Sequence, residues 1–538
     1  MVNYKDFAKT EDVAYNIHTA LLYCKEKGED GLVFDKGEYH IFAERASEGV
    51  YAMSNHSDAG FKRCCFLLEG FENFTIDGNG SDFIFEEILT PVIISNSKNV
   101  TVKGFSFTAK EDLAGQFDVV RAGDGWMDIK TTHGTIYTHG GDLYAGQFKG
   151  ETKKLRYFDI HDSQGRIIDG PSEHFFAAHD SDNRMVFKAL EDGTYHAECL
   201  PAPVYEGQKL VMGAGTRRAA TIFVNASENT KIENVTVYSG IGMGIIAQNS
   251  KNIDIGHFNT KCKDGRCFSI NADGTHFVHC EGDIRIHDCY FEGQLDDALN
   301  VHGIYLKIVD KIDNTLLLKE VHHEQVGIDV VSAGDVLQTA DPETLIPNGE
   351  YKVKSVKRIN LQLLEVVIDG DASDIRIGDV ADEISHVPDV IFENCTLVNN
   401  RARGMLLASA GKITIRNNLF KTPGPSIKFE SDGKYWYESG GTKDVLITGN
   451  TFENCKYSGW GDSVIVVTPR EKTEEGKYYH KKIAVVENEF KNCKGYLASI
   501  DNTETFVFKG NRIIGQELNL YRTTHCKTVD VDEQKKGL

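Results

Sequence analysis

Residues 443–455 read KDVLITGNTFENC, and the same pattern recurs as KIAVVENEFKNC at 482–493 and as GDIRIHDCYFEG at 282–293. In each segment apolar and polar residues alternate over a short strand, a Gly, Asn or Asp breaks the alternation, and a second short strand follows. One such unit cannot bury its own apolar side chains, so repeated units stack and share one core. The pattern predicts an all-β chain folded as a right-handed parallel β-helix.

Further units of this kind lie on both sides, many of them about 20 to 35 residues apart, which is the length of one coil. They are FTIDGNG at 74–80, NVTVKGFSF at 99–107, TKIENVTVYS at 230–239, KNIDIGHFNT at 251–260, PDVIFENCTLVNN at 388–400, GKITIRNNLF at 411–420 and ETFVFKGNRI at 504–513. Ahead of them, residues 11–27 place apolar side chains at helical spacing behind Thr10, which predicts one amphipathic helix. We expect this helix to cover the open end of the solenoid.

Two stretches, 108–217 and 303–387, interrupt the repeat. They contain longer hairpin-like segments such as GIYLKIVDKIDNTLLLKE, with a turn at Asp313-Asn314, so we predict two inserted antiparallel β-barrel-like modules. The chain then divides into five parts. They are 1–107 with the cap and first coils, 108–217, 218–302 with more coils, 303–387, and 388–538 with the last coils.

Composition excludes several classes of protein. With 80 acidic and 59 basic residues the chain carries a net charge of −21 and has no basic block, so a nucleic-acid partner is not expected. Apolar runs are strand-sized, so no membrane partner is expected either. Because the sequence shows no leader segment, we expect a cytoplasmic protein, or a secreted or periplasmic one if a leader has been removed.

The cysteine pattern points to reduced thiols. Twelve cysteines without a CxxC pair or a secretory signal do not suggest a disulfide framework. Four of them follow an Asn or Asp at the end of a strand unit, and equivalent positions of a solenoid stack. We therefore predict an internal ladder formed by Cys289, Cys395, Cys455 and Cys493.

An acidic cluster is the strongest candidate for chemistry. The segment GQLDDALNVHG holds Asp296 and Asp297, and ADGTHF places Asp273 one coil-length earlier, 23 residues before Asp296. Stacked coils would bring the three carboxylates onto one outer face. Clustered carboxylates raise one another's pKa, which lets one act as general acid while another acts as base, the division that glycoside hydrolysis needs. A solvated acidic turn is the simpler interpretation.

The geometry of a regular strand sets a condition on this cluster. Consecutive strand residues point to opposite faces, so Asp296 and Asp297 could not share a site within one strand. We therefore predict a bulge or a corner between strands at these two residues.

Other polar and aromatic residues suit a sugar, whose apolar face stacks on aromatic rings and whose hydroxyls seek charged partners. The segment FESDGKYWYESGG carries Glu430, Trp436 and Glu438, and NNRARG carries Arg401 and Arg403. The alternative is an ordinary polar loop with surface arginines.

Asn300, His276 and His302 lie close to the aspartates in sequence, and we expect them to contact substrate. Together with His279, the two histidines could in principle bind a metal ion, but their spacing matches no usual ligand motif. Hydrogen-bonding roles are therefore expected for all three histidines, with no metal and no cofactor.

Taken together, ADGTHF, DDALNVHGIYL, NNRARGMLL, IRNNLF and WYESGGTKDVLI resemble glycoside hydrolase family 110, the bacterial exo-α-1,3-galactosidases. The resemblance spans most of the chain. It implies a metal-independent, inverting enzyme that releases terminal α-1,3-linked galactose from blood group B-like or linear glycans, with Asp273, Asp296 and Asp297 as its essential aspartates. By analogy with β-helical polygalacturonases, Asp296 would be the acid, and Asp297 with Asp273 would activate water. A homodimer is also consistent with the family.

Two other functions compete. Another β-helix carbohydrase, such as a polygalacturonase-like hydrolase or a polysaccharide lyase, would want Lys and Arg around its anionic substrate, whereas this chain is acidic. A non-catalytic, glycan-binding β-helix would release no sugar, and its aspartates could be replaced with little loss of binding.

Overall fold

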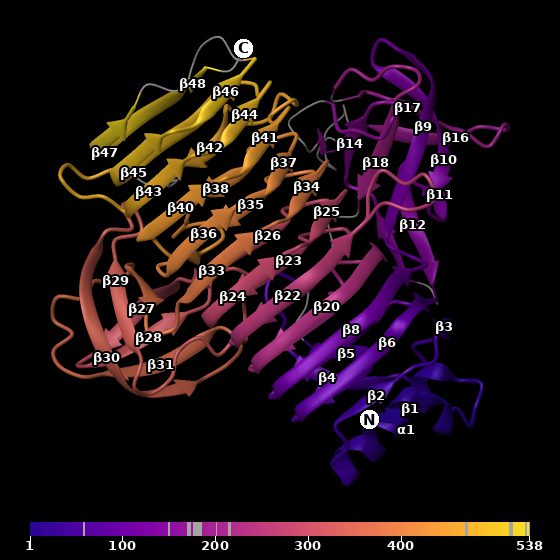
Figure 1. Cartoon of the computed structure of the whole chain (residues 1–538), viewed down its shortest axis with the longest axis horizontal. Helices are drawn as coiled ribbons and strands as arrows, with labels where there is room; N and C mark the ends of the chain where they lie inside the picture. The colour runs from indigo at the N-terminus through magenta and orange to yellow at the C-terminus, as the bar shows by residue number, and fades with distance from the viewer. Residues whose placement is uncertain are drawn as a thin grey trace.

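The computed structural model describes residues 1–56, 60–148, 151–168, 174–175, 185–200, 202–213, 217–468, 472–515, 520–532 and 535–536. Its body is a solenoid whose coils ascend from the N-terminus to the C-terminus (Figure 1). Neighbouring coils pair in parallel, as where Ile447 lies beside Val485. The predicted parallel β-helix is therefore present.

The coils carry strands on three faces. The first face contains β6 (Glu72–Phe85), β8 (Lys98–Ala109), β20 (Glu228–Ser239), β22 (Lys251–Thr260), β24 (Glu281–His287), β33 (Pro388–Glu393), β36 (Lys412–Arg416), β40 (Asp444–Thr448), β43 (His480–Val486), β45 (Tyr496–Lys509) and β47 (Tyr521–Val531). The second contains β5 (Gly60–Glu69), β7 (Thr90–Ser95), β19 (Ile222–Asn225), β21 (Ile245–Gln248), β23 (Thr275–Val278), β26 (Leu299–Ile304), β35 (Met405–Leu407), β38 (Ile427–Phe429) and β42 (Ser463–Val467). The third contains β25 (Tyr290–Glu292), β34 (Thr396–Val398), β37 (Leu419–Lys421), β41 (Thr451–Glu453), β44 (Glu489–Lys491), β46 (Arg512–Ile514) and β48 (Lys535–Lys536).

The N-terminal end is closed by α1 (Val13–Lys27), which packs Ile17, Leu21 and Cys24 into the core together with the short strands β1 (Val2–Asn3), β2 (Gly31–Val33), β3 (Glu38–Ile41) and β4 (Ser47–Tyr51). The expected helix is present but begins later than predicted, because the Asp12 carboxylate, and not Thr10, accepts the Tyr15 N–H at 2.8 Å. No helix in the described part of the chain has the length and apolar character needed to span a bilayer.

Inside the solenoid, polar side chains stack from coil to coil. The Asn418 amide donates to Asn450 Oδ1, and the Asn450 amide donates to Asn488 Oδ1, both at 2.9 Å. The row continues to Asn511, and on its other side the Cys395 N–H donates to Asn418 Oδ1 at 2.8 Å. These side chains are buried, and each one satisfies polar groups of the next coil.

The predicted cysteine ladder is divided between two rows. Cys289 stacks on Cys395, through an N–H to Sγ contact of 3.4 Å, and so extends the asparagine row. Cys455 and Cys493 lie at a different corner, where each thiol contacts the backbone of the preceding coil, at Phe420 and Phe452. Sequence spacing alone could not separate the corners, because both follow the same strand and turn pattern. All twelve cysteines are unpaired, as expected.

We expect Asn450→Ala to destabilise the protein by about 1–3 kcal/mol for each buried group that it leaves unpaired. The Asn450 amide also donates to the Ile415 carbonyl, at 2.9 Å, so several groups lose their partner. Urea unfolding measures the loss. Asn259→Ala is the control, because this half-exposed asparagine donates to Thr236 Oγ1 at 3.4 Å and to the nearby His257 carbonyl at 3.0 Å, outside the buried row. An equal loss in both variants would contradict the ladder's role.

The first insertion forms an antiparallel sheet in the order β15-β14-β18-β9-β10-β17-β16, with a three-stranded sheet β11-β12-β13 beside it and one shared apolar core. Its strands are β9 (Ala114–Gly123), β10 (Trp126–His133), β11 (Ile136–His139), β12 (Asp142–Phe148), β13 (Glu151–Lys154), β14 (Tyr157–His161), β15 (His174–Phe175), β16 (Val186–Ala189), β17 (Tyr195–Glu198) and β18 (Lys209–Gly213).

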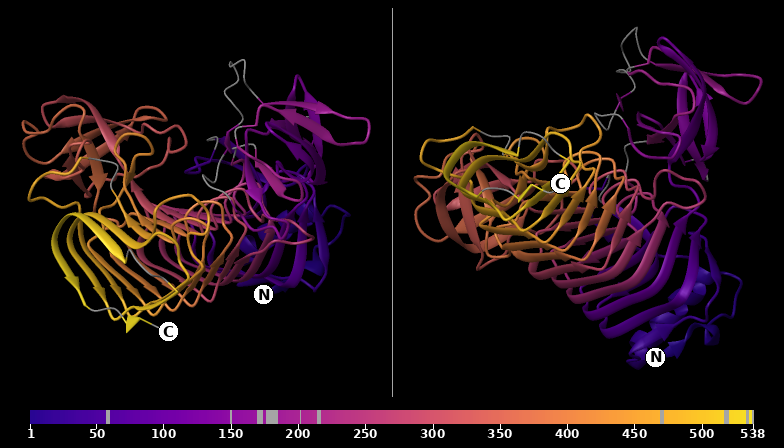
Figure 2. Two further views of the ribbon diagram at one scale, coloured as in Figure 1. Left: turned by 90° about the horizontal axis from the view of Figure 1, so that it is seen from above. Right: turned by 45° about the horizontal axis from the view of Figure 1, so that its top comes forward.

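The second insertion is a closed barrel in the order β27-β28-β31-β30-β29-β32. Its strands are β27 (Leu306–Ile312), β28 (Thr315–Lys319), β29 (Val336–Ala340), β30 (Pro347–Arg358), β31 (Leu363–Ile368) and β32 (Val380–Glu383). As predicted, β27 turns into β28 at Asp313-Asn314, where Asp313 takes the left-handed conformation with φ 52°. Both insertions stand on the same side of the solenoid (Figure 2).

Candidate active site

The aspartates lie at one corner of the solenoid, where the chain turns into the second face. Asp273 comes just before β23, Asp297 just before β26 and Arg403 just before β35. The corners stack, because the Gly274 N–H donates to the Asp297 carbonyl at 2.8 Å. Asp296 and Asp297 lie in the bend between β25 and β26, so the predicted corner is confirmed.

This stacking brings the three carboxylates together, with one oxygen of each within 4.8 Å of the others. The Asp297 N–H donates to Asp273 Oδ1 at 3.1 Å, which fixes the two residues relative to each other. The Asp296 side chain is 13% exposed, compared with 3% for Asp273 and 0% for Asp297. Asp296 is therefore the member of the group that a sugar can reach most directly.

Three guanidiniums contact two of the three carboxylates. Arg217 donates to Asp296 Oδ2 at 2.8 Å, and Arg401 lies 3.6 Å from Asp296 Oδ1. Arg403 holds Asp297 twice, through its side chain at 2.7 Å and its backbone N–H at 2.9 Å. Each guanidinium lies beside a carboxyl group, which offsets the cost of burying its charge.

Burial and the neighbouring arginines give the three aspartates different pKa values. Burial raises the pKa of Asp273 to about 7 and that of Asp297 to about 8, although Arg403 opposes the second shift. Burial also acts on Asp296, but Arg401 and Arg217 outweigh it and hold its pKa below the usual range. One cluster thus contains both an anion and protonated carboxyls near neutral pH.

A chain of hydrogen bonds extends from Asp273 into the protein. His302 Nδ1 lies 2.7 Å from the Gly303 carbonyl, which can only accept, so His302 donates there. His302 Nε2 lies 2.9 Å from His276 Nε2, and His276 Nδ1 lies 2.6 Å from Asp273 Oδ2. Each of the three bonds needs a proton, which is one more than a carboxylate and two neutral imidazoles carry.

The extra proton belongs on Asp273. Burial lowers the pKa of His302 to about 4 and holds that of His276 well below its usual value, whereas it raises that of Asp273. A neutral chain that starts with a protonated Asp273 satisfies every bond. The two imidazoles thus orient Asp273 and stabilise its protonated form.

We expect His276→Phe to lower kcat by up to about 10²-fold, because a misplaced reacting group can cost that much. The value of KM should change far less than kcat. The pH profile of kcat/KM should shift, because the pKa of Asp273 changes when its partner His276 is lost. The control is His480→Phe, since His480 is equally buried but bonds Thr442, away from the aspartates. A lower melting temperature with an unchanged pH profile would assign His276 a purely structural role.

His276 and His302 are as deeply buried as Asp273 and Asp297, with side chains 1% and 0% exposed. Their contact with substrate therefore stays a prediction. Arg401 and Arg403 are likewise not surface residues, because both are engaged by the aspartates. Asn300 is buried beside His276, and its Oδ1 has no hydrogen-bond partner among the described residues.

The other predicted residues come from the segment that follows β38. Glu438 begins β39 (Glu438–Ser439), which pairs with β26, and its Oε1 lies 3.6 Å from His302 Nε2. Burial raises the pKa of Glu438 to about 8. Glu430 binds Lys428 at 2.6 Å. The half-buried Trp436 packs against His322 of the second insertion, with ring centroids 4.5 Å apart and the planes tilted by 38°.

Sequence reasoning missed Arg217 and the contribution of the second insertion. Arg217 enters from the connection after the first insertion and also lies 3.8 Å from Glu324, in the second. The Asn55 N–H donates to the Glu324 carbonyl at 2.7 Å, so the N-terminal coils take part as well. No repeat or motif marks these residues.

The three carboxylates have the donor chemistry of a hard-cation site. Asp296 and Asp297 already hold guanidiniums, however, and Asp297 uses both oxygens to accept from Arg403. A divalent cation would have to displace these arginines. The donor set therefore fits acid and base chemistry better than metal binding.

A β-helix with paired, unequally protonated carboxylates at one corner defines a class, the β-helical glycoside hydrolases. Residues 367–532 match the family model of the right-handed β-helix region, and residues 315–380 match that of the GLAA-B β-barrel domain II. The right-handed fold class is thus confirmed.

An α-1,3-galactosidase A of Shewanella woodyi is 30% identical, covering 94% of this chain and 83% of its own length. An α-1,3-galactosidase B of Bacteroides thetaiotaomicron is also 30% identical, covering 99% and 91%. Among solved structures, a tailspike protein of the E. coli bacteriophage HK620 has a TM-score of 0.46 at 11% identity, covering 100% and 66%. The chain belongs to the α-1,3-galactosidase family, which confirms the resemblance to glycoside hydrolase family 110. It is a glycoside hydrolase with an oligosaccharide substrate.

Proposed function

We propose that this enzyme is an exo-acting, inverting hydrolase that releases terminal α-1,3-linked galactose from blood group B-like or linear glycans. The observation that carries the proposal is the convergence of Asp273, Asp296 and Asp297 from two stacked corners, with unequal pKa values. That arrangement supplies both a proton donor and a carboxylate that can activate water.

In the proposed mechanism Asp296 protonates the departing oxygen, while Asp273 and Asp297 hold the attacking water. The greater exposure of Asp296 supports this assignment, because the glycosidic oxygen must reach the acid. The electrostatics without sugar favour the opposite state, an ionised Asp296 and a protonated Asp273. The proposal therefore requires one proton to pass from Asp273 to Asp296 when the sugar displaces Arg217, across carboxylates less than 4.8 Å apart.

The proposed inversion at the anomeric carbon rests on the family resemblance and not on the distances between the carboxylates. Inverting enzymes usually separate acid and base by about 6.5–9.5 Å. Carboxylate oxygens within 4.8 Å of one another are closer than that range. The attacking water would instead have to sit beside Asp273 and Asp297.

Proton NMR tests the function directly. The protein is incubated with Gal-α-1,3-Gal and with the branched blood group B trisaccharide, and the first galactose anomer is recorded. Early β-galactose is the expected result, and the preferred substrate defines the specificity. Early α-galactose would contradict inversion, and no galactose from either substrate would contradict the proposed linkage.

Trp436 is proposed to stack on the sugar, and Glu430, Glu438 and Asn300 are proposed to bind its hydroxyls. We also propose a homodimer, as in the family-based expectation. Light scattering of the purified protein distinguishes a dimer from a monomer of 59.9 kDa.

A further inference from the structure

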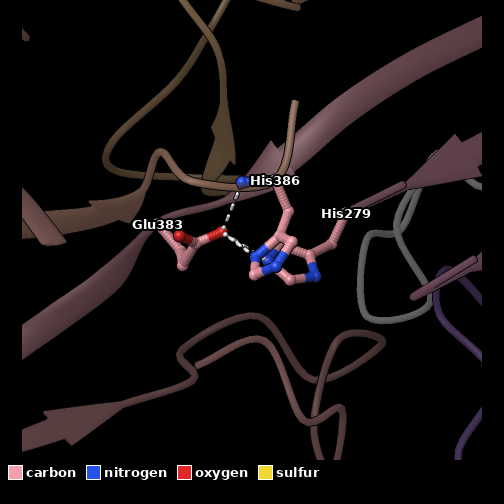
Figure 3. A group of neighbouring side chains, drawn as sticks. All are labelled: His279, Glu383 and His386. Carbon is pink, nitrogen blue, oxygen red and sulfur yellow. Dashed lines mark hydrogen bonds and ion pairs between the residues drawn. The ribbon is translucent and has the colours of Figure 1, made fainter. Parts of the chain in front are cut away.

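A second group of metal-ligating side chains lies where the barrel meets the solenoid, and the proposed function does not use it. His279 follows β23 of the solenoid, Glu383 ends β32 of the barrel, and His386 lies in the connection back to β33. His279 Nε2 and His386 Nδ1 each lie 3.0 Å from the same oxygen, Glu383 Oε2 (Figure 3). The three side chains therefore converge on one point.

Glu383 Oε2 is the centre of this group. It also accepts the backbone N–H of His386 at 3.2 Å. His279 Nδ1 lies 3.0 Å from Asn249 Oδ1, so Nε2 is the nitrogen that His279 turns toward the carboxylate. The ligating atoms of the three side chains all lie within 4.8 Å of one another, so two imidazoles and a carboxylate surround one point.

The distances are close to those around a metal ion. Two ligand atoms about 2.1 Å from one tetrahedral ion lie about 3.4 Å from each other. The two nitrogen-to-oxygen distances are 3.0 Å, so each would lengthen by a few tenths of an ångström when the ion binds. The carboxylate is also held in place, because the Ser385 N–H donates to Glu383 Oε1 at 2.6 Å.

Outer contacts around the group follow the pattern of metal sites, in which each ligating imidazole directs its other nitrogen at an oxygen. Asn249 serves His279 in this way, whereas Glu281 Oε2, 4.0 Å from His386 Nε2, is near that nitrogen but beyond hydrogen-bond distance. Asp335 Oδ1, 3.9 Å from His386 Nδ1, adds a further carboxylate beside the site.

We propose that His279, Glu383 and His386 bind one divalent transition-metal ion of the zinc class, which clamps the barrel to the solenoid. Two imidazoles and one carboxylate are ligands that this class of metal prefers over Mg²⁺ or Ca²⁺. The ion joins residues 104 positions apart in the chain. His279 follows the strand that carries His276, so the clamp also steadies the base of the active site.

The test uses the whole protein, treated with a chelator and then titrated with Zn²⁺ by calorimetry and with Co²⁺ by absorbance. We expect one ion per chain, a higher melting temperature with the ion, and a Co²⁺ spectrum without thiolate charge-transfer bands. His386→Gln and Glu383→Gln should weaken binding more than about tenfold. His386 is 34% exposed at its side chain, so its variant tests the site even if Glu383→Gln misfolds.

The matched control is His40→Gln. His40 also contacts two carboxylates, those of Glu86 at 2.7 Å and Glu38 at 2.9 Å, but on the solenoid surface and without a second imidazole. Its variant should bind the ion like the wild type. The proposal would be overturned if the protein bound no ion, if His386→Gln bound it as tightly as the wild type, or if Co²⁺ gave thiolate bands. It would also be overturned if Asp297→Asn were the variant that lost binding while His386→Gln and Glu383→Gln kept it, because the ion would then lie at the aspartates.

Discussion

Asp296→Asn is expected to lose about 10²- to 10⁴-fold in kcat on Gal-α-1,3-Gal, yet to retain most of its turnover of α-galactosyl fluoride. An amide cannot protonate the departing oxygen of a disaccharide. Fluoride leaves as a stable anion without a proton, so an enzyme that lacks only its acid still cleaves this substrate. Release of galactose and of fluoride, measured side by side, gives the two rates.

Asp273→Asn and Asp297→Asn supply the contrast. Both variants should lose turnover of both substrates, because water must still be activated when the leaving group is good. If Asp273→Asn is instead the variant that keeps the fluoride reaction, then Asp273 is the acid and the ionised Asp296 is the base, as the resting electrostatics favour. Full activity of all three variants would remove the site from catalysis altogether.

The sequence was sufficient for the solenoid and its corner because both depend on local, repeated features. Alternation fixes which side chains face the core, and coil length brought Asp273 close to the aspartate pair. The spacing of 23 residues aligned Asp273 with Asp296, whereas the strands pair with an offset of 24 and place it beside Asp297. The bend at Asp296 followed from strand geometry alone. The cysteine ladder was only half right, since spacing cannot distinguish one corner from another.

Contacts made by the insertions could not be predicted. Arg217 reaches Asp296 across 79 positions, and His279 reaches Glu383 across 104. Each contact depends on how an antiparallel module docks on the solenoid, which no periodicity encodes. The hydrogen bond between His276 and His302 could not be predicted either, because it depends on how neighbouring coils pack.

The insertions therefore complete a site that the solenoid begins. The coils supply the carboxylates in register, and Arg217 after the first insertion neutralises the most exposed one. The second insertion supplies His322, against which Trp436 packs. Specificity for a terminal sugar would then depend on the modules, and the hydrolytic chemistry on the coils.

Arg403→Leu is expected to destabilise the enzyme by about 3–5 kcal/mol at pH 9, and by less at pH 6. Asp297 is fully buried, and its carboxylate depends on the Arg403 guanidinium at 2.7 Å. Burial raises the pKa of Asp297 to about 8, so at pH 6 the folded protein holds a neutral carboxyl that can lose its cation at smaller cost. Unfolding in urea at the two pH values measures the difference.

The sign of this pH dependence follows from linkage. In the folded wild type the pKa of Asp297 lies above its value of 3.8 in a model peptide, so stability falls as pH rises and levels off above about 8. Without the Arg403 guanidinium the pKa of Asp297 in the folded variant is higher still, so the stability of the variant keeps falling above pH 8. The gap between the two proteins must therefore widen above pH 8.

Two further variants separate charge from packing. Arg512→Leu breaks an exposed pair with Glu489, also 2.7 Å long, and should cost at most about 1 kcal/mol at either pH.

Adding Asp297→Asn to Arg403→Leu removes the buried charge, and the amide oxygen can still accept the backbone N–H of residue 403. The double variant should regain stability at pH 9 without regaining activity. A double variant as unstable as the single one would mean that Arg403 acts through packing, for which its approach to the Trp460 ring, 5.9 Å away, offers the contact.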